Sequence, residues 1–331
     1  MPEGHASIRY LGLSSVRVTE SAALASAKMI GCGDERKADE AAVAAMIDAL
    51  NELDIDGTVR IGTDESQETM SLKPGTKVGI GKHQKVDVAL MPVEGPSIVA
   101  RGAPNGMSII AMTEPGGFLH PPDIYMEKIA VGEGLPEDVV SLDETPEKNL
   151  TALAKAKGRS VSEIIACILD RPRNSELIKQ VRAAGARVLL ISDGDVSGAM
   201  ATIWPGSQID ILMGIGSAPQ GVLAAAALSS MGGQMQCRFV FRDQEDRKLV
   251  EKSDIGDPDK IFNTQELASG DITFAATGVT NGHILSGVGL RHGVPTTQSI
   301  VMRRSTGILR VIESFHGFAE RPHLRRNHSG D

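Results

Sequence analysis

The chain has 331 residues, of which 41% are hydrophobic and only 3% aromatic, so its cores must consist mainly of Ala, Val, Ile, Leu and Met. This length allows two packed domains of ordinary size. The formal net charge of −8 argues against nucleic acid as the main partner, because binding to a phosphate backbone needs a basic surface.

The N-terminal half predicts a helix over residues 17–30, beginning near Thr19 or Ser21, and a second helix over residues 38–53 with its apolar side chains on one face. Three strands are predicted in this half, namely Thr58–Ile61, Val86–Met91 and Ser108–Met112. The segment 131–147 is rich in Gly, Pro and acids, which is typical of a connection between domains.

The C-terminal half predicts an alternation of helices and strands. Helices are predicted over 145–157, 174–184, from 195 onward and over 218–230, and strands over 164–169, 187–192, 209–213, 272–276, 298–303 and 307–313. This alternation favours an α/β fold with a mostly parallel sheet and helices on both faces. We therefore expect an N-terminal α/β domain over residues 1–145, a C-terminal α/β domain over 146–318 and a charged tail over 319–331.

The chain shows no pattern typical of secretion or of membranes. The cysteines Cys32, Cys167 and Cys237 are far apart and have no CxxC spacing, which argues against a disulfide framework and a zinc ribbon. No signal-peptide pattern and no apolar stretch of about 18 residues occurs. We expect a cytoplasmic protein with neither membrane nor nucleic acid as a partner.

Candidate binding residues follow the predicted strands, because ligands of α/β sheets bind beyond the carboxyl ends of the strands. Arg171 and Arg173 could both contact one phosphate, or form a solvated basic turn. Asp193 and Asp195 could accept hydrogen bonds from sugar hydroxyls, while Asp195 could instead cap a helix. Tyr125 could contact a phosphate or simply pack against its neighbours.

Two weaker patterns concern ions. Gly214-Ile215-Gly216, followed by Ser217, could surround an anion with backbone amides, although a tight turn has the same composition. Scattered acids of the N-terminal half could supply the oxygen ligands that Mg²⁺ and Mn²⁺ prefer, or could lie singly on surface turns. These acids are Asp34, Asp39, Asp64, Glu65, Glu68 and Glu94.

Taken together, a series of ordered segments between about residues 17 and 316 resembles the class II fructose-1,6-bisphosphatases. The segments are VTESAALASAKMIGCGDERKADEAAV, IDGTVRIG, VDVAL, PPDIYMEKIAVG, LDRPR, LISDGDV, MGIGSAPQGV, ATGVTNG, TTQSIVMR and IESFH. The resemblance implies the layered two-domain α/β fold of the lithium-sensitive phosphatases. It also implies hydrolysis of the 1-phosphate of fructose 1,6-bisphosphate with Mn²⁺ or Mg²⁺ in gluconeogenesis, and we expect a homo-oligomer.

The substrate side of the site matches the family well. The resemblance implies that a small phosphorylated sugar is bound by Glu94, Gly95, Tyr125, Arg171, Arg173, Asp193, Asp195 and Ser217. We therefore expect the anion-binding half of the site to be intact.

The metal side departs from the family. Asp39 and Glu94 match ligand positions, but Thr63 and Gln220 replace ligand glutamates and Met91 replaces a ligand aspartate. A thioether is a soft ligand that suits Mg²⁺ or Mn²⁺ poorly, and neutral oxygens do not offset the charge of the metal. The resemblance thus implies a damaged metal site.

The position that orients the attacking water in the family is changed as well. Pro96 stands where the family has Thr, and proline offers neither a hydroxyl nor a backbone N–H. Ser97, the next hydroxyl along the chain, is the candidate substitute.

Three functions follow from these residues. The first is an impaired or inactive homologue that still binds a sugar phosphate. The second is an active metal-dependent phosphatase whose ligands are rearranged to Asp64, Glu65, Glu68 and Glu94. The third is a structural partner in an oligomer, with an empty pocket.

Overall fold

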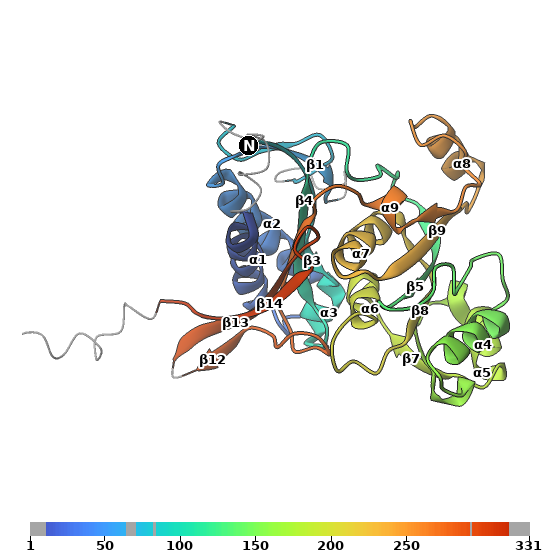
Figure 1. Cartoon of the computed structure of the whole chain (residues 1–331). Coiled ribbons are helices and arrows are strands. Elements are labelled where there is room, and N and C mark those ends of the chain that lie inside the picture. The colour runs from blue at the N-terminus through green and yellow to red at the C-terminus, as the bar shows by residue number, and fades with distance from the viewer. Residues whose placement is uncertain (1–10, 64–70, 82–83, 292, 318–331) are drawn as a thin grey trace, which may run out of the picture.

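The computed structural model describes residues 11–63, 71–81, 84–291 and 293–317, and these form five alternating layers of helix, sheet, helix, sheet and helix (Figure 1). Helices α1 (Leu11–Ala27) and α2 (Glu35–Asn51) pack on the outer face of the first sheet, and their apolar side chains share one core with it. Helices α6 (Asp195–Ala201) and α7 (Ala218–Met231) lie between the two sheets. The prediction of a layered α/β fold is confirmed.

The first sheet has the strand order β12-β13-β11-β4-β3-β1-β2, with β14 beside β13. Its strands are β1 (Ile55–Ile61), β2 (Lys77–Val78), β3 (Gln84–Glu94), β4 (Met107–Thr113), β11 (Thr273–Gly278), β12 (Gly289–Arg291), β13 (Val294–Arg303) and β14 (Ile308–Phe315). Within the described strands of this sheet, β1 and β3 form the one parallel pair.

The second sheet has the order β10-β9-β5-β8-β6-β7. Its strands are β5 (Tyr125–Val131), β6 (Ile165–Leu169), β7 (Arg187–Ile191), β8 (Ile211–Ser217), β9 (Gln234–Val240) and β10 (Phe262–Asn263). Strand β6 pairs in parallel with β7 and β8, whereas β5 runs antiparallel to both β8 and β9. The prediction of a mostly parallel sheet is therefore wrong, because β5 enters this sheet from outside the alternating part of the sequence.

Sheet membership does not follow the expected division into residues 1–145 and 146–318. Strand β5 precedes residue 145 but lies in the second sheet, and strands β11 to β14 return from the C-terminal half to complete the first sheet. The buried α6 and α7 pack against both sheets, so one apolar cluster joins them. The expected tail, 319–331, lies outside the described residues.

The remaining helices lie around both sheets, the first of them next to α2 beside the first sheet and the others around the second sheet. They are α3 (Pro96–Arg101), α4 (Pro146–Ala156), α5 (Ser175–Ala183), α8 (Gln244–Glu251), α9 (Thr264–Leu267) and the 3₁₀ turns η3 (Val161–Glu163) and η4 (Pro172–Asn174). Helix α1 begins six residues earlier than predicted, because the Thr19 hydroxyl donates to Val16 O at 3.0 Å within the helix and does not cap it. None of the helices in the described ranges is long and apolar enough to cross a membrane.

Candidate functional site

The substrate-side candidates meet at one edge of the second sheet. Parallel strands β6, β7 and β8 end at this edge, and antiparallel β5 begins there. Arg171 and Arg173 follow β6, Asp193 follows β7, Ser217 ends β8, and Tyr125 begins β5 directly opposite Ser217. Five residues that are far apart in the chain are thus brought to the carboxyl ends of neighbouring strands.

Arg173 is oriented by two contacts and is half-buried. Its Nε donates a hydrogen bond to Ile215 O at 2.8 Å, and its guanidinium carbon lies 4.4 Å from the centre of the Tyr125 ring. The cation–π contact and the carbonyl acceptor hold the group over the ring. Arg171, two residues earlier in the chain, donates a hydrogen bond from Nη1 to the Asp170 carbonyl oxygen at 3.5 Å. Tyr125 therefore does pack, but against an arginine of the candidate site.

The Asp193-Gly194 turn links this edge to the first sheet. Ser97 Oγ donates to Asp193 Oδ2 at 3.4 Å, and Gly194 N donates to Asp193 Oδ1 at 3.1 Å. Burial raises the pKa of Asp193, and the charge of Arg171 opposes that shift. Gly194 has a φ of 97° and is the N-cap of α6, so the alternative that Asp195 caps this helix is wrong.

A buried lysine that sequence reasoning missed supports the same turn. Lys128 lies on β5 with its side chain only 1% exposed, and its Nζ donates to Asp195 Oδ2. A side chain at position 216 would collide with the Asp195 carboxylate, so Gly216 makes room for the pair. The sequence signal that could have indicated this buried pair is a lysine among the apolar residues of β5. Asp195, at 5% exposure, faces Lys128 and contributes to the site as a support.

Glu94 is fully buried at the end of β3 and is held by the first turn of α6. The backbone N–H groups of Val196 and Ser197 donate to its two carboxyl oxygens at 2.8 and 3.2 Å. Burial raises the pKa of Glu94 to about 8 against the effect of these two hydrogen bonds, and the carboxylates of Asp193 and Asp195 also raise it. The retained ligand position is therefore engaged by protein donors.

Two of the substituted ligand positions contact each other. Met91 of β3 and Gln220 of α7 are 129 positions apart in the chain, yet Gln220 Nε2 lies 4.0 Å from Met91 Sδ. Both side chains are half-buried, and Met91 packs on the central apolar cluster. An amide and a thioether thus occupy the place where the resemblance implies two carboxylates.

The other metal-side candidates lie at separate points. Thr63 is tied to Leu72, because Leu72 N donates to Thr63 Oγ1 at 3.0 Å and Thr63 N donates to Leu72 O at 3.1 Å. Asp39 is half-buried on α2. Gly95 is the N-cap of α3 with a φ of 75°, and Pro96 is the first residue of that helix. Asp64, Glu65 and Glu68 lie outside the described residues.

These observations test whether the described residues could hold divalent cations. In the parts of the chain that the structure describes, no group of three or more His, Cys, Asp or Glu side chains is arranged to hold a metal ion. Met91 offers a soft sulfur, and both oxygens of Glu94 are used by amides. The described residues therefore do not fit the metal pair that the family resemblance implies.

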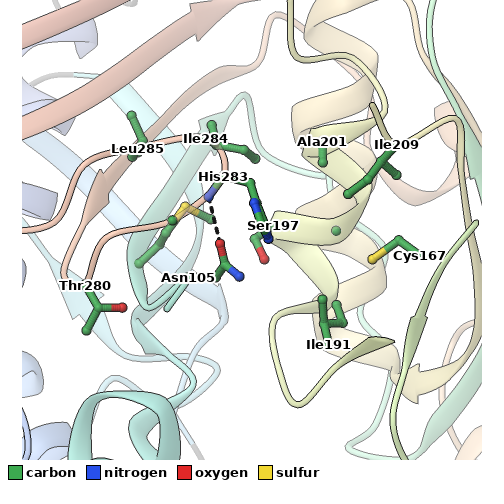
Figure 2. A pocket seen from close by; sticks show the side chains of 13 residues that line it. Asn105, Cys167, Ile191, Ser197, Ala201, Ile209, Thr280, His283, Ile284 and Leu285 are labelled. Carbon is green, nitrogen blue, oxygen red and sulfur yellow. Dashed lines mark hydrogen bonds between the residues drawn. The ribbon is translucent and has the colours of Figure 1, made fainter. Parts of the chain in front are cut away.

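A narrow crevice lies between α6 and the loop after β11 (Figure 2). Figure 2 shows His283, whose backbone N donates to Asn105 Oδ1 at 2.9 Å, beside Ser197. The crevice volume of about 10 Å³ admits about one water molecule. This crevice is too small for a sugar phosphate. The strand edge is the candidate binding surface because the predicted substrate-side residues meet there.

Comparisons with known proteins agree with this geometry. A sequence profile described as "Bacterial fructose-1,6-bisphosphatase, glpX-encoded" matches residues 9–316. The chain is 38% identical to a protein of Synechococcus sp. (strain JA-3-3Ab) over 92% of this chain and 95% of the relative. It is 36% identical to a protein of Trichodesmium erythraeum (strain IMS101) over 94% of this chain and 97% of the relative.

Both relatives carry the name D-fructose 1,6-bisphosphatase class 2/sedoheptulose 1,7-bisphosphatase. The profile covers nearly the whole chain, and the layered α/β architecture agrees with the fold of this phosphatase family. A sugar-phosphate ligand fits the same family. The chain belongs to the class II fructose-1,6-bisphosphatase family.

Proposed function

We propose that this protein binds a small phosphorylated sugar, such as fructose 1,6-bisphosphate or sedoheptulose 1,7-bisphosphate, and that its metal-dependent hydrolysis is strongly impaired or lost. The observation that carries the proposal is the 4.0 Å contact between Met91 Sδ and Gln220 Nε2. These two side chains occupy positions where the resemblance implies an aspartate and a glutamate. At the point where these two side chains meet, the protein therefore presents an amide and a thioether in place of two carboxylates.

The chemistry of hydrolysis explains why this contact matters. In metal-assisted hydrolysis of a phosphate ester, the cations generate the attacking hydroxide and stabilise the leaving oxygen. Hard divalent cations need several anionic oxygens, which neither a thioether nor an amide supplies. The first residue of α3 is Pro96, which cannot orient a water molecule through a hydroxyl. Binding a sugar phosphate, by contrast, depends on guanidinium groups that are present.

The experiment measures binding and turnover on the same protein. Fructose 1,6-bisphosphate is titrated calorimetrically into the purified chain, and phosphate release is followed with Mn²⁺ and with Mg²⁺. We expect binding without metal and little or no phosphate release. Robust metal-dependent turnover would contradict the proposal, and absence of both binding and turnover would support a purely structural role.

A set of reversions sharpens this test. Thr63→Glu, Met91→Asp, Pro96→Thr and Gln220→Glu are introduced together, and we expect the set to create or greatly raise phosphatase activity. Single reversions should do little, because groups that act as a unit are strongly non-additive. Gln180→Glu is the matched control, since it adds a carboxylate on the exposed face of α5.

A second candidate function is an active bisphosphatase with rearranged ligands. The identity of 38% to a named bisphosphatase over 92% of this chain favours it. Asp64, Glu65 and Glu68 would then act with Glu94. Turnover by the wild-type protein that disappears in the triple variant Asp64→Asn/Glu65→Gln/Glu68→Gln would establish this alternative.

The cytoplasmic location and the homo-oligomer belong to the same proposal. Exposed apolar side chains on the outer strands of the first sheet support self-association, since Leu290 of β12 is 76% exposed and Val311 of β14 is 50% exposed. Sedimentation of the purified protein tests the oligomer.

A further inference from the structure

A second guanidinium group lies beside Tyr125. Arg242 follows β9 by two residues, and its guanidinium carbon is 5.4 Å from the centre of the Tyr125 ring, compared with 4.4 Å for Arg173. Because both distances are measured to the same point, the two guanidinium carbons lie within about 10 Å of each other. Sequence reasoning did not single out Arg242, since it matches no binding motif.

Topology places Arg242 at the candidate edge. Strand β9 runs antiparallel to β5, and its last residue, Val240, pairs with Tyr125. The end of β9 therefore lies at the same edge as the ends of β6, β7 and β8. Arg242 reaches the ring from the end of β9, and Arg173 reaches it from η4, which follows β6. In the strand order β9 and β6 lie on opposite sides of β5, so the two cations come from both sides of the strand that carries Tyr125.

Arg242 is held in one orientation by Asp246 of α8. Its Nε and Nη2 donate to the two carboxyl oxygens of Asp246, both at 2.8 Å, and its backbone N donates to Asp246 Oδ2 at 2.9 Å. The Asp246 side chain is 4% exposed, and its hydrogen bonds with Arg242 lower its pKa to about 2, so it is ionised. The two-pronged contact limits the rotamers of Arg242 before any ligand arrives.

The remaining donors of both arginines are available. Among the described residues, Nη1 of Arg242 has no hydrogen-bond partner, and neither terminal nitrogen of Arg173 has one. The Arg242 side chain is 55% exposed, so its free donors face solvent. A phosphoryl dianion carries three acceptor oxygens, which suits two guanidinium groups and a phenol at one edge.

We propose that Arg242 is a further phosphate-binding residue, which contacts a phosphoryl group of the bound sugar phosphate together with Arg173, and that Asp246 is its positioning residue. The proposal rests on the proposed function, because it assigns a further contact to the same ligand. It makes the Tyr125 edge a site for a phosphoryl group flanked by two arginines.

The test compares Kd values for fructose 6-phosphate and fructose 1,6-bisphosphate by calorimetry. We expect Arg242→Gln to raise both Kd values about 10- to 100-fold, as the loss of a charged hydrogen bond implies. The double variant Arg242→Gln/Asp246→Asn avoids an unpaired buried carboxylate and should show the same loss. Arg247→Gln is the matched control on α8, because its guanidinium also lies 5.2 Å from a ring, that of Phe241, and pairs with Asp259.

Asp246 has its own readout. We expect Asp246→Asn to raise the Kd, but by less than Arg242→Gln does. We expect Asp246→Glu to recover part of the lost affinity while its melting temperature equals that of Asp246→Asn. The dependence of log Kd on salt should become shallower in Arg242→Gln, because one cation no longer contacts the phosphate. A merely structural role would leave that salt dependence unchanged.

The outcomes separate this inference from the proposed function. Wild-type binding with the same Kd in Arg242→Gln and in the double variant would overturn the role of Arg242 alone. Absence of binding to the wild-type protein would contradict the proposed function and this inference with it. Equal losses in Arg242→Gln and Arg247→Gln would also overturn it, because they would indicate a nonspecific effect of charge.

Discussion

The end of β3 and the carboxyl-end edge of the second sheet form two halves of one candidate site, and they differ in what their side chains contact. At the end of β3, Met91 contacts Gln220 and Glu94 accepts hydrogen bonds from the backbone of α6. At the sheet edge, Arg173 is held by a carbonyl and an aromatic ring while its terminal nitrogens have no partner among the described residues.

Under the proposed function, this difference means that one fold has lost its cation ligands while it keeps its anion ligands. The positions where the resemblance implies lost metal ligands lie near β1, on β3 and on α7, whereas the proposed anion-binding residues follow β6, β7 and β9 or begin β5. Because the two sets lie on different elements, a change in one set does not displace the other. The predictions below test this independence.

The largest expected effect concerns the buried support of the sheet edge. Lys128→Met leaves the Asp195 carboxylate, which is 5% exposed, without its partner. We expect the free energy of unfolding to fall by about 3–5 kcal/mol, as for other broken buried ion pairs. Urea denaturation followed by circular dichroism measures it.

Two controls accompany this prediction. Lys128→Met/Asp195→Asn removes both charges and should recover most of the loss, because no unpaired charge stays buried. Lys155→Met on the exposed face of α4 should change little. A cost below about 1 kcal/mol for Lys128→Met would show that the edge does not depend on this pair.

A smaller effect is expected when an anion contact is removed. Arg173→Gln removes the guanidinium that lies 4.4 Å from the Tyr125 ring centre, and the Kd for fructose 1,6-bisphosphate should rise about 10- to 100-fold. Calorimetry with Arg182→Gln, an exposed arginine of α5, as the control checks this. Unchanged affinity would mean that the sugar phosphate binds elsewhere.

The smallest effect is expected at the end of β3. Replacing Met91 by Leu and Gln220 by Met exchanges one weak contact at 4.0 Å for apolar packing of similar volume, so stability should change by less than about 1.5 kcal/mol. Binding of fructose 1,6-bisphosphate should be unchanged. If this variant lost a metal-dependent phosphatase activity that the wild type has, the comparison between the two halves would fail.

Local patterns predicted the elements better than their pairing. The apolar run of residues 218–230 predicted α7 to within one residue, because a helix that is buried on all sides needs apolar residues throughout. No strand was predicted over residues 125–131 or 234–240, so the sequence patterns missed β5 and β9 together with their antiparallel pairing. Pairing direction depends on where the chain returns, which a local pattern does not contain.

The sequence alone determined the family and the layered α/β class, because these depend on ordered local segments, and it predicts which ligand positions are changed. Tertiary structure decided that Met91 contacts Gln220, that Lys128 pairs with Asp195 and that Arg242 lies beside Tyr125. Each of these contacts joins residues on different elements of the packed layers. Their distances depend on how sheets and helices pack, and no spacing along the chain encodes that packing.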